Sequence, residues 1–221
     1  YKLIVLAPAS VQEMSDFVPL AFDLAFKYRN PVMILSDGVI GQMMEKVELF
    51  DQIPRATEFD QTWVTTGRTP DRERNIHSSL DLDPARFEKH NHHLQKKYKK
   101  IIENEVRFEN IQCDDADYVL VAYGSSSRIC QKAQKLAREK GIKAGLLRPI
   151  TLFPFPYEEI EKLANHVKGF LAVELSAGQM VEDVRLAVGK KTKIEFYGRI
   201  GGMIPTPTEI LDVLEEKYLG G

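Results

Sequence analysis

The sequence predicts an α/β protein with three layers, αβα, around a mainly parallel sheet. From Asp114 onward, short apolar runs typical of buried strands alternate with stretches of helical periodicity. The strand candidates are residues 118–122, 143–147, 170–174 and 193–197, and the helical patterns cover 126–140, 156–167, 179–188 and 208–218. Because a helix follows each strand, neighbouring strands should pair in parallel, with helices on both faces of the sheet.

The first fifty residues show the same alternation on a smaller scale. Residues 2–7 form an apolar strand candidate, and Ser10 and Glu13 have the spacing of a capping box that begins a helix. Pro19 falls inside the helical pattern, where it should kink or restart the helix because it lacks an N–H donor. Residues 31–38 then form a second strand candidate that runs into a turn. Such a unit predicts parallel pairing with a right-handed crossover.

The middle of the chain is polar and irregular, apart from one long amphipathic helix. Asp83 and Pro84 provide the N-cap and the first-turn proline of this helix. Its apolar stripe comprises Phe87, Leu94, Tyr98, Ile101 and Ile102. The stripe needs a surface, so we expect the helix to pack against a domain or a partner. We therefore divide the chain into a partial α/β unit at 1–50, a connector at 51–112 and a small α/β domain at 113–221.

The charge balance argues against two classes of partner. The 221 residues include 30 basic and 32 acidic ones, with a formal net charge of −2, which gives no electrostatic basis for binding nucleic acid or an acidic membrane. No apolar run approaches the length of a membrane span, and the N-terminal residues lack the zones of a signal peptide. We therefore expect a cytoplasmic protein without nucleic-acid or membrane partners.

Cysteine usage limits the redox chemistry that this chain can carry. Cys113 and Cys130 are the only cysteines, too few for a metal or iron–sulfur motif, so any redox metal should sit on another chain. The sequence also begins at Tyr1, almost inside a strand candidate and without an initiator Met. We expect the natural protein to extend further toward its N-terminus.

A small polar turn, Gly124, Ser125, Ser126 and Ser127, joins a strand candidate to a helix. The N-terminus of a helix presents free N–H groups at the positive end of its dipole, which suits an anion. The turn lacks the residue spacing of both a Walker A loop and a dinucleotide fingerprint. We favour the interpretation that one serine caps the helix while Gly124 makes the tight turn, and phosphate binding is the alternative.

Three further strand ends carry candidate site residues. Glu174 ends a strand and Gln179 begins the next helix, so Glu174 is either an acid or base at the carboxyl edge of the sheet or a residue fixed in an ion pair or interface. Asp37 also lies at a strand end, although an Asp-Gly turn is its ordinary explanation. The loop that contains Arg199, Gly201 and Gly202 mixes glycines and prolines, which suggests a shaped loop that lines a site or packs on a neighbouring subunit.

The histidines at 90–93 do not make a convincing metal site. His90 and His93 are three residues apart and could share a helix face, but no nearby carboxylate or cysteine completes a ligand set. We favour a solvated helix face for them. On these observations alone, the chemistry of the protein stays undetermined.

Six stretches along the chain carry a family resemblance. They are "IVLAPASVQEM", "KYRNPVMILSDGVIGQM", "EKHNHHLQKKY", "DADYVLVAYGSSSRICQKA", "GLLRPITLFPFP" and "ELSAGQMVEDVRLAV". In this order they resemble the α subunit of thiamine-diphosphate-dependent 2-oxoacid:ferredoxin oxidoreductases, and most of all the 2-oxoisovalerate (3-methyl-2-oxobutanoate) branch. The resemblance covers nearly the whole chain.

This resemblance implies a cofactor site that is shared with another subunit. Residues 1–50 resemble the C-terminal half of a thiamine-pyrimidine domain, and residues 113–221 resemble a transketolase C-terminal-like domain. In the family, thiamine diphosphate and Mg²⁺ lie between the pyrimidine domain and a pyrophosphate domain on a partner. The carboxylate that activates the aminopyrimidine belongs to the N-terminal half of the pyrimidine domain, so we assign no catalytic residue in this sequence.

The resemblance also implies partners and a reaction. We expect an oligomeric complex with a pyrophosphate-domain β subunit, a γ subunit and a ferredoxin-like subunit, with the iron–sulfur clusters on those partners and ferredoxin as acceptor. The implied reaction is oxidative decarboxylation of a 2-oxoacid, with coenzyme A taking the acyl group. We expect the loops at 124–127, 174–179 and 199–202 to serve mostly as interface. Two alternatives stay open: a non-catalytic assembly module, and a transketolase or pyruvate-dehydrogenase-type partner domain that works without ferredoxin.

Overall fold

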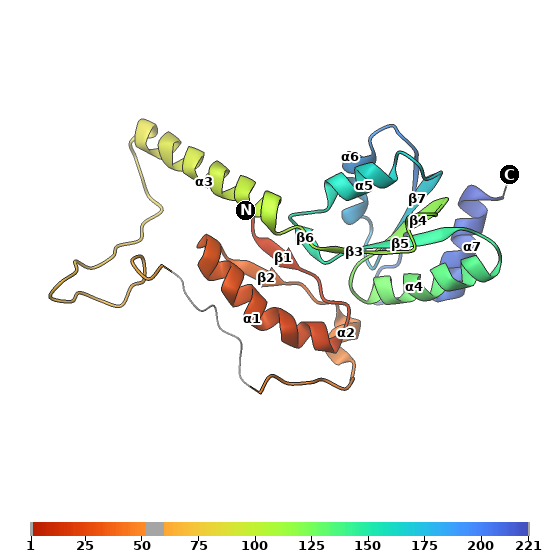
Figure 1. Ribbon diagram of the computed structural model, residues 1–221, viewed down its shortest axis with the longest axis horizontal. Helices are drawn as coiled ribbons and strands as arrows, with labels where there is room; N and C mark the ends of the chain where they lie inside the picture. Colours follow the sequence, from red (N-terminus) through yellow and green to blue (C-terminus); the bar gives the residue numbers. More distant parts are fainter. Residues whose placement is uncertain (1, 52–59, 221) are drawn as a thin grey trace.

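The computed structural model describes residues 2–51 and 60–220, which form two β-sheets and their helices (Figure 1). The strands are β1 (Ile4–Leu6), β2 (Val32–Ile34), β3 (Phe108–Ile111), β4 (Tyr118–Val121), β5 (Ala144–Pro149), β6 (Thr151–Phe153), β7 (Gly169–Glu174) and β8 (Lys193–Gly198). The helices are α1 (Val11–Tyr28), α2 (Gly38–Gln42), α3 (Pro84–Asn104), α4 (Gly124–Glu139), α5 (Tyr157–Leu163), α6 (Met180–Val188) and α7 (Pro207–Tyr218). None of these helices combines the length and the apolar composition that a bilayer span requires.

The small sheet has the strand order β2-β1-β6. Its first two strands are parallel, with Ile4 opposite Val32, as the strand–helix–strand pattern predicts. Ser10 caps α1 by accepting the Glu13 N–H at 3.1 Å. The Glu13 carboxylate accepts the N–H of Ala9 at 2.7 Å, one residue before the partner that a capping box predicts.

Pro19 was predicted to kink or restart the first helix, and the restart is wrong. α1 runs as one helix of 18 residues, with Pro19 inside it. An internal proline costs about 3 kcal/mol, because it removes a hydrogen bond and crowds the preceding turn. Phe17 and Leu24 are buried on the inner face of α1, and burying such side chains stabilises by about 1.5–3 kcal/mol each, which offsets that cost.

The large sheet has the order β3-β5-β4-β7-β8 and confirms the predicted three-layer architecture. The four predicted strands of this sheet, β5, β4, β7 and β8, are parallel to one another, and β3 pairs antiparallel with β5 at the edge. One core lies between the sheet and α5 and α6, and a second lies on the other face beneath α4 and α7. The parallel strands are apolar on both faces for this reason.

The two sheets are joined by more than the connecting chain. β6 follows β5 by one residue but pairs antiparallel with β1, so that Val5 lies opposite Phe153. At the end of β5, the guanidinium of Arg148 makes two hydrogen bonds to the Glu13 carboxylate, at 2.7 and 3.0 Å, and its side chain is only 7% exposed. A strand pairing and a half-buried bidentate ion pair therefore hold the two sheets together.

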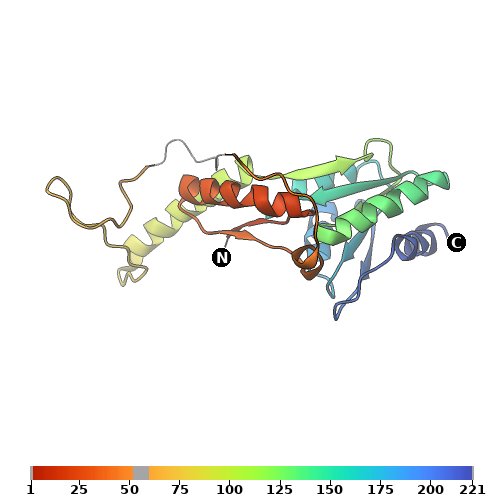
Figure 2. The same ribbon diagram turned by 90° about the horizontal axis from the view of Figure 1, so that it is seen from below.

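The long helix α3 packs at one end and projects at the other (Figures 1 and 2). Asp83 caps it through the N–H groups of Ala85 and Arg86, as predicted. Near its C-terminus, Ile101 is fully buried in the core of the small sheet, whereas Phe87 near the N-terminus is 45% exposed. The predicted stripe is therefore covered only in part: Ile101 is buried and Leu94 and Tyr98 are half-buried, but Ile102 is 44% exposed and does not belong to the packed face.

Candidate functional site

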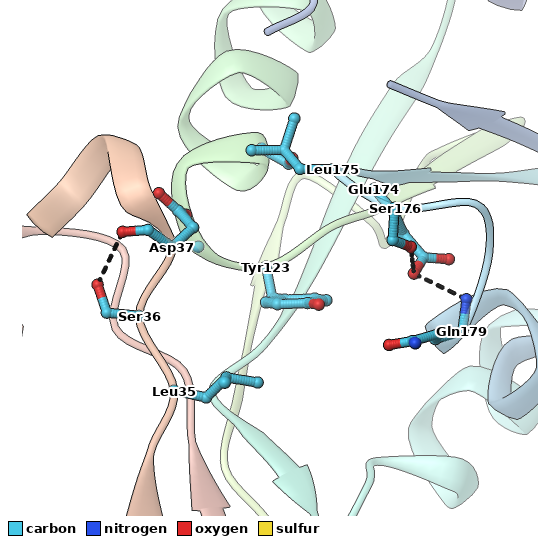
Figure 3. A pocket seen from close by; sticks show the side chains of 10 residues that line it. Leu35, Ser36, Asp37, Tyr123, Glu174, Leu175, Ser176 and Gln179 are labelled. Atoms are coloured by element: carbon cyan, nitrogen blue, oxygen red, sulfur yellow. Dashed lines mark hydrogen bonds between the residues drawn. The ribbon is translucent and has the colours of Figure 1, made fainter. Parts of the chain in front are cut away.

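The carboxyl ends of β2, β4 and β7 meet around a pocket of about 250 Å³ between the two sheets (Figure 3). The residues that line it are Leu35, Ser36, Asp37, Tyr123, Gly124, Ser126, Glu174, Leu175, Ser176 and Gln179. Ligands of open α/β sheets gather at this edge because the following helices begin there. The structure thus brings together five of the nine predicted candidates, and we call this space the interdomain pocket.

Asp37 connects two helix N-termini across the interdomain pocket. Its Oδ1 atom accepts the N–H groups of Val39 and Ile40, both at 3.0 Å, and so caps α2. Its Oδ2 atom accepts the N–H of Ser125 at 2.7 Å, at the start of α4 in the other sheet. Each helix dipole stabilises the same carboxylate. Asp37 therefore links the two sheets, in addition to making the Asp-Gly turn that its local sequence suggests.

Gly124 makes this contact possible. Its φ angle is +59°, and a Cβ atom added there would lie 2.6 Å from Oδ2 of Asp37. No other residue type avoids both the left-handed backbone cost and that contact. The predicted tight turn at Gly124 is present, and it allows the Asp37 carboxylate to approach the start of α4 closely.

The prediction that a serine caps α4 is wrong. The N-cap residue is Tyr123, which makes no side-chain capping bond. Ser127 Oγ donates instead to the Gly124 carbonyl at 2.7 Å, and the buried Ser125 Oγ has no partner among the described residues. The serines cannot cap because they lie inside the first turn, and the Asp37 carboxylate provides the acceptor in their place. A carboxylate of the same chain thus occupies the position that phosphate would take.

Glu174 is fixed as the cap of α6. Its side chain is 1% exposed; Oε2 accepts the N–H groups of Gln179 and Met180 at 3.0 Å, and Oε1 accepts the N–H of Val181 at 2.9 Å. The hydroxyl of Ser176 donates a fourth hydrogen bond at 3.0 Å. The interpretation of Glu174 as a member of an ion pair is wrong, because backbone amides at a helix N-terminus stabilise its charge instead.

Tyr123 is the principal pocket residue that the sequence reasoning missed. Its ring stands in the interdomain pocket between the Asp37 and Glu174 sides (Figure 3). Burial raises the pKa of its hydroxyl, and the carboxylates of Glu174 and Asp37 raise it further. Its place at the strand end directly before Gly124 was the available signal. The hydroxyl stays protonated and can donate to a ligand, beside the exposed Gln179 amide.

A second hollow, of about 630 Å³, adjoins the first and shares Asp37 and Leu175 with it. Arg199 and Gly202 line this second hollow, whereas Gly201 and Ser125 line neither space. The Arg199 guanidinium lies 3.4 Å from the Glu209 carboxylate. The candidates at residues 199–202 are therefore neighbours of the interdomain pocket, not part of its wall.

The chemistry of the interdomain pocket follows from this lining. Two carboxylates and a protonated phenol face it, and none of the described residues that line it is a Lys or Arg. It suits a hydrogen-bonding or cationic group better than a phosphate. Within residues 2–51 and 60–220, no three His, Cys, Asp or Glu side chains are grouped so that they could hold a metal ion. His90 and His93 stack on the surface of α3, with ring centroids 6.4 Å apart.

Comparison with known proteins identifies the family. The model described as "Pyruvate flavodoxin/ferredoxin oxidoreductase, thiamine diP-bdg" matches residues 1–111, and "Pyruvate:ferredoxin oxidoreductase core domain II" matches residues 116–210. The chain therefore belongs to the 2-oxoacid:ferredoxin oxidoreductase family, as its sequence motifs indicated.

Two curated relatives place the similarity within the family. The chain is 46% identical to the ketoisovalerate oxidoreductase subunit VorB of Methanothermobacter thermautotrophicus, over 98% of this chain and 60% of that subunit. It is 32% identical to the 2-oxoglutarate synthase subunit KorA of Methanothermobacter marburgensis, over 96% of this chain and 63% of that subunit. The chain thus spans less than two thirds of the length of either relative.

Two solved structures share the fold. A 2-oxoglutarate:ferredoxin oxidoreductase from Magnetococcus marinus superposes with a TM-score of 0.73 at 20% identity, over 97% of this chain and 42% of that one. A split-gene transketolase in an inactive β4 tetramer gives a TM-score of 0.53 at 14% identity, over 97% of this chain and 57% of that one. The predicted transketolase-like α/β fold is confirmed.

Proposed function

We propose that this chain is the larger part of one subunit of an oxidoreductase that converts 2-oxoisovalerate to its acyl-CoA. The 46% identity to a ketoisovalerate oxidoreductase subunit, against 32% to a 2-oxoglutarate synthase subunit, carries this proposal. In the balanced reaction, one 2-oxoacid anion, one coenzyme A and two oxidised ferredoxins give one acyl-CoA, one CO₂, two reduced ferredoxins and a proton. The complex would act in the cytoplasm.

The residues of this chain do not fit the diphosphate end of thiamine diphosphate. The Asp37 carboxylate already accepts a hydrogen bond from the Ser125 N–H at the start of α4. The Glu174 carboxylate likewise accepts hydrogen bonds from the N–H groups at the start of α6. A diphosphate would meet negative charge in the interdomain pocket and would find no Lys or Arg among the described residues that line it. The described residues also bring together no three His, Cys, Asp or Glu side chains that could hold its Mg²⁺. We therefore assign the diphosphate and Mg²⁺ to a pyrophosphate domain on the β subunit, and the iron–sulfur clusters to the γ and ferredoxin-like subunits.

The role of this chain in the complex is to hold two sheets in a fixed relation and to present loops to a partner subunit. Ile200, Met203 and Ile204 are 64%, 55% and 44% exposed on the loop after β8. Exposed apolar side chains at the rim of a hollow are typical of a subunit contact. We infer that the β subunit covers this loop.

The test uses the full-length protein with its native partner subunits. Viologen reduction is followed with coenzyme A and, in turn, 3-methyl-2-oxobutanoate, pyruvate and 2-oxoglutarate. Preference for the branched acid supports both family activity and branch. Preference for another acid would keep the activity and reject the branch, while no reduction by a cofactor-loaded complex would reject the activity.

An assembly module without cofactor affinity is the second candidate, favoured by the two carboxylates that occupy the helix N-termini. Calorimetric titration with thiamine diphosphate and Mg²⁺ separates the two candidates. The subunit alone should give no heat beyond dilution, and the complex should give saturable binding. A complex that gives no heat of binding with thiamine diphosphate and Mg²⁺ would favour the assembly module. A transketolase or pyruvate-dehydrogenase-type partner domain would instead turn over without ferredoxin or viologen.

A further inference from the structure

A strongly basic hollow lies at the opposite edge of the small sheet from the interdomain pocket. It has a volume of about 570 Å³ and is bounded by the C-terminus of α1 and one face of α3. Six basic side chains line it: Lys27, Arg29, His93, Lys96, Lys97 and Lys100. The other two lining residues are Tyr28 and Asn104, so none of the described residues that line the space is a carboxylate. We call this space the basic hollow.

Most of this positive charge has no carboxylate counterpart. Lys27 forms an ion pair with the buried Glu105 at 2.7 Å, but Arg107 uses the same carboxylate at 2.8 Å. Among the described residues, Lys96 and Lys100 form no ion pair. This contrasts with a chain whose total charge is nearly balanced, with a formal net charge of −2.

Two of the cationic residues of the basic hollow, Lys97 and Arg29, lie close to one another. The Lys97 ammonium donates to the Arg29 carbonyl at 3.2 Å, and the Arg29 guanidinium lies 4.9 Å from the centre of the Trp63 ring. Burial lowers the pKa of Lys97, and repulsion from Arg29 lowers it further. The charge of Arg29 contributes little to the lowered pKa of Asp60, which is due mainly to hydrogen bonds with Thr62. Lys97 and Arg29 are thus held close together with only the weak attraction of Asp60 to offset their repulsion, and a bound anion would relieve it.

We propose that the basic hollow binds a small anion that carries two or more phosphate groups. Its volume lies in the range of about 300–1,000 Å³ that is typical of small-molecule sites. Lysine ammonium groups are point-charge donors that suit phosphate oxygens. Lys96 and Lys100 lie one helical turn apart on the same face, so two phosphate groups can be contacted at once.

A small polyphosphate fits better than an acidic protein segment. These charges converge on one hollow and do not form an extended track, which suits a compact polyphosphate better than an extended acidic segment. Of the neutral lining residues, Tyr28 already donates its hydroxyl proton to Glu105, whereas the Asn104 amide uses one N–H on the Lys100 carbonyl and keeps a second for a ligand oxygen. This inference does not depend on the proposed reaction, because the two sites lie at opposite edges of the sheet.

The experiment measures binding of inorganic tripolyphosphate and of ADP to the full-length subunit in its complex, by calorimetry at low and at physiological ionic strength. The variant Lys96→Glu/Lys100→Glu should weaken both affinities by at least about tenfold, because two charge-assisted contacts are lost and two like charges are placed beside the phosphate groups. Affinity of the unaltered protein should fall as salt is raised. Lys96→Gln/Lys100→Gln provides a milder variant if the charge reversal unfolds the protein.

The matched control is Lys132→Glu/Lys135→Glu, which makes the same charge change at two exposed lysines of α4, remote from the basic hollow. This control should change either affinity by less than about twofold. Three results would overturn the proposal: no binding of either probe, equal loss in both charge-reversal variants, or tighter binding of a decaglutamate peptide than of tripolyphosphate. Because no 2-oxoacid is involved, each result is independent of the viologen assay.

Discussion

Replacing Gly124 by Ala tests whether the contact between Asp37 and α4 holds the two sheets together. The new Cβ would lie 2.6 Å from Oδ2 of Asp37, so the carboxylate has to move away from the Ser125 N–H. Losing a hydrogen bond to a charged group costs about 1.5–3 kcal/mol. The left-handed backbone at φ +59° adds about 1–2 kcal/mol for any residue other than glycine. We expect a loss of about 2.5–5 kcal/mol in the free energy of unfolding.

Gly141→Ala is the matched control for this substitution. Gly141 has a φ angle of +83°, and nothing lies within 4 Å of an added Cβ, so it carries the backbone cost alone. Its expected loss is about 1–2 kcal/mol. Guanidinium unfolding of the full-length subunit gives both values, and Gly124→Ala should also be measured in the Asp37→Ala background. There the Gly124→Ala cost should shrink to that of the control.

Two results would refute this reasoning. Equal losses for Gly124→Ala and Gly141→Ala would mean that the Asp37 carboxylate does not constrain the start of α4. An unchanged cost of Gly124→Ala after Asp37 has been removed would mean that the two residues are not coupled. In either case, the strand pairing of β6 with β1 would have to hold the two sheets together without this contact.

Three other substitutions test separate parts of the structure. Glu174→Gln should destabilise the subunit by about 2–3 kcal/mol, because one oxygen acceptor becomes an amide that faces N–H donors; lost turnover with unchanged unfolding would instead indicate an acid or base. Burial opposes ionisation of Glu105, but hydrogen bonds from Lys27, Tyr28 and Arg107 outweigh it and lower its pKa below the ordinary 4.5. The stabilisation that ionised Glu105 gives to the folded state is therefore present above pH 4.5 and is lost as the pH falls through the lowered pKa. The difference in unfolding free energy between wild type and Glu105→Gln, measured by urea titration, should narrow from pH 7 to about pH 3. A constant difference would contradict this. Gly201→Val/Gly202→Val should weaken binding of the β subunit more than it lowers Tm, measured by pull-down and calorimetry. The control Gly141→Val/Gly189→Val, which also replaces two glycines of positive φ with no atom within 4 Å of an added Cβ, should affect Tm alone.

Local pattern predicted most of the fold. The strands β4, β5, β7 and β8 and their helices are long and periodic enough to be located from apolar spacing. β3 was missed because its two central residues, Glu109 and Asn110, are polar and exposed, and β6 because only one residue separates it from β5. Pairing of β6 with β1 joins residues about 150 positions apart, which no local signal encodes. The division at residues 50 and 112 stays a prediction.

Position at strand ends predicted where the site lies, but not what its residues do. Asp37, Gly124 and Glu174 each follow a parallel strand, and the carboxyl ends of parallel strands share one edge. The Asp37 carboxylate binds the N-terminus of α4 because the two sheets are in contact. The sequence around Asp37 does not indicate this contact. Tyr123 was missed because an aromatic residue at a strand end is ordinarily part of the core.

Product stoichiometry in the reconstituted complex is the most direct test of the proposed function. Full-length subunits would be supplied with 3-methyl-2-oxobutanoate, coenzyme A and ferredoxin, and acyl-CoA, CO₂ and reduced ferredoxin would be measured together. The proposed reaction predicts the branched acyl-CoA and CO₂ in equal amounts, with two reduced ferredoxins for each. Acyl-CoA without ferredoxin reduction, or ferredoxin reduction only with an unbranched acid, would contradict it.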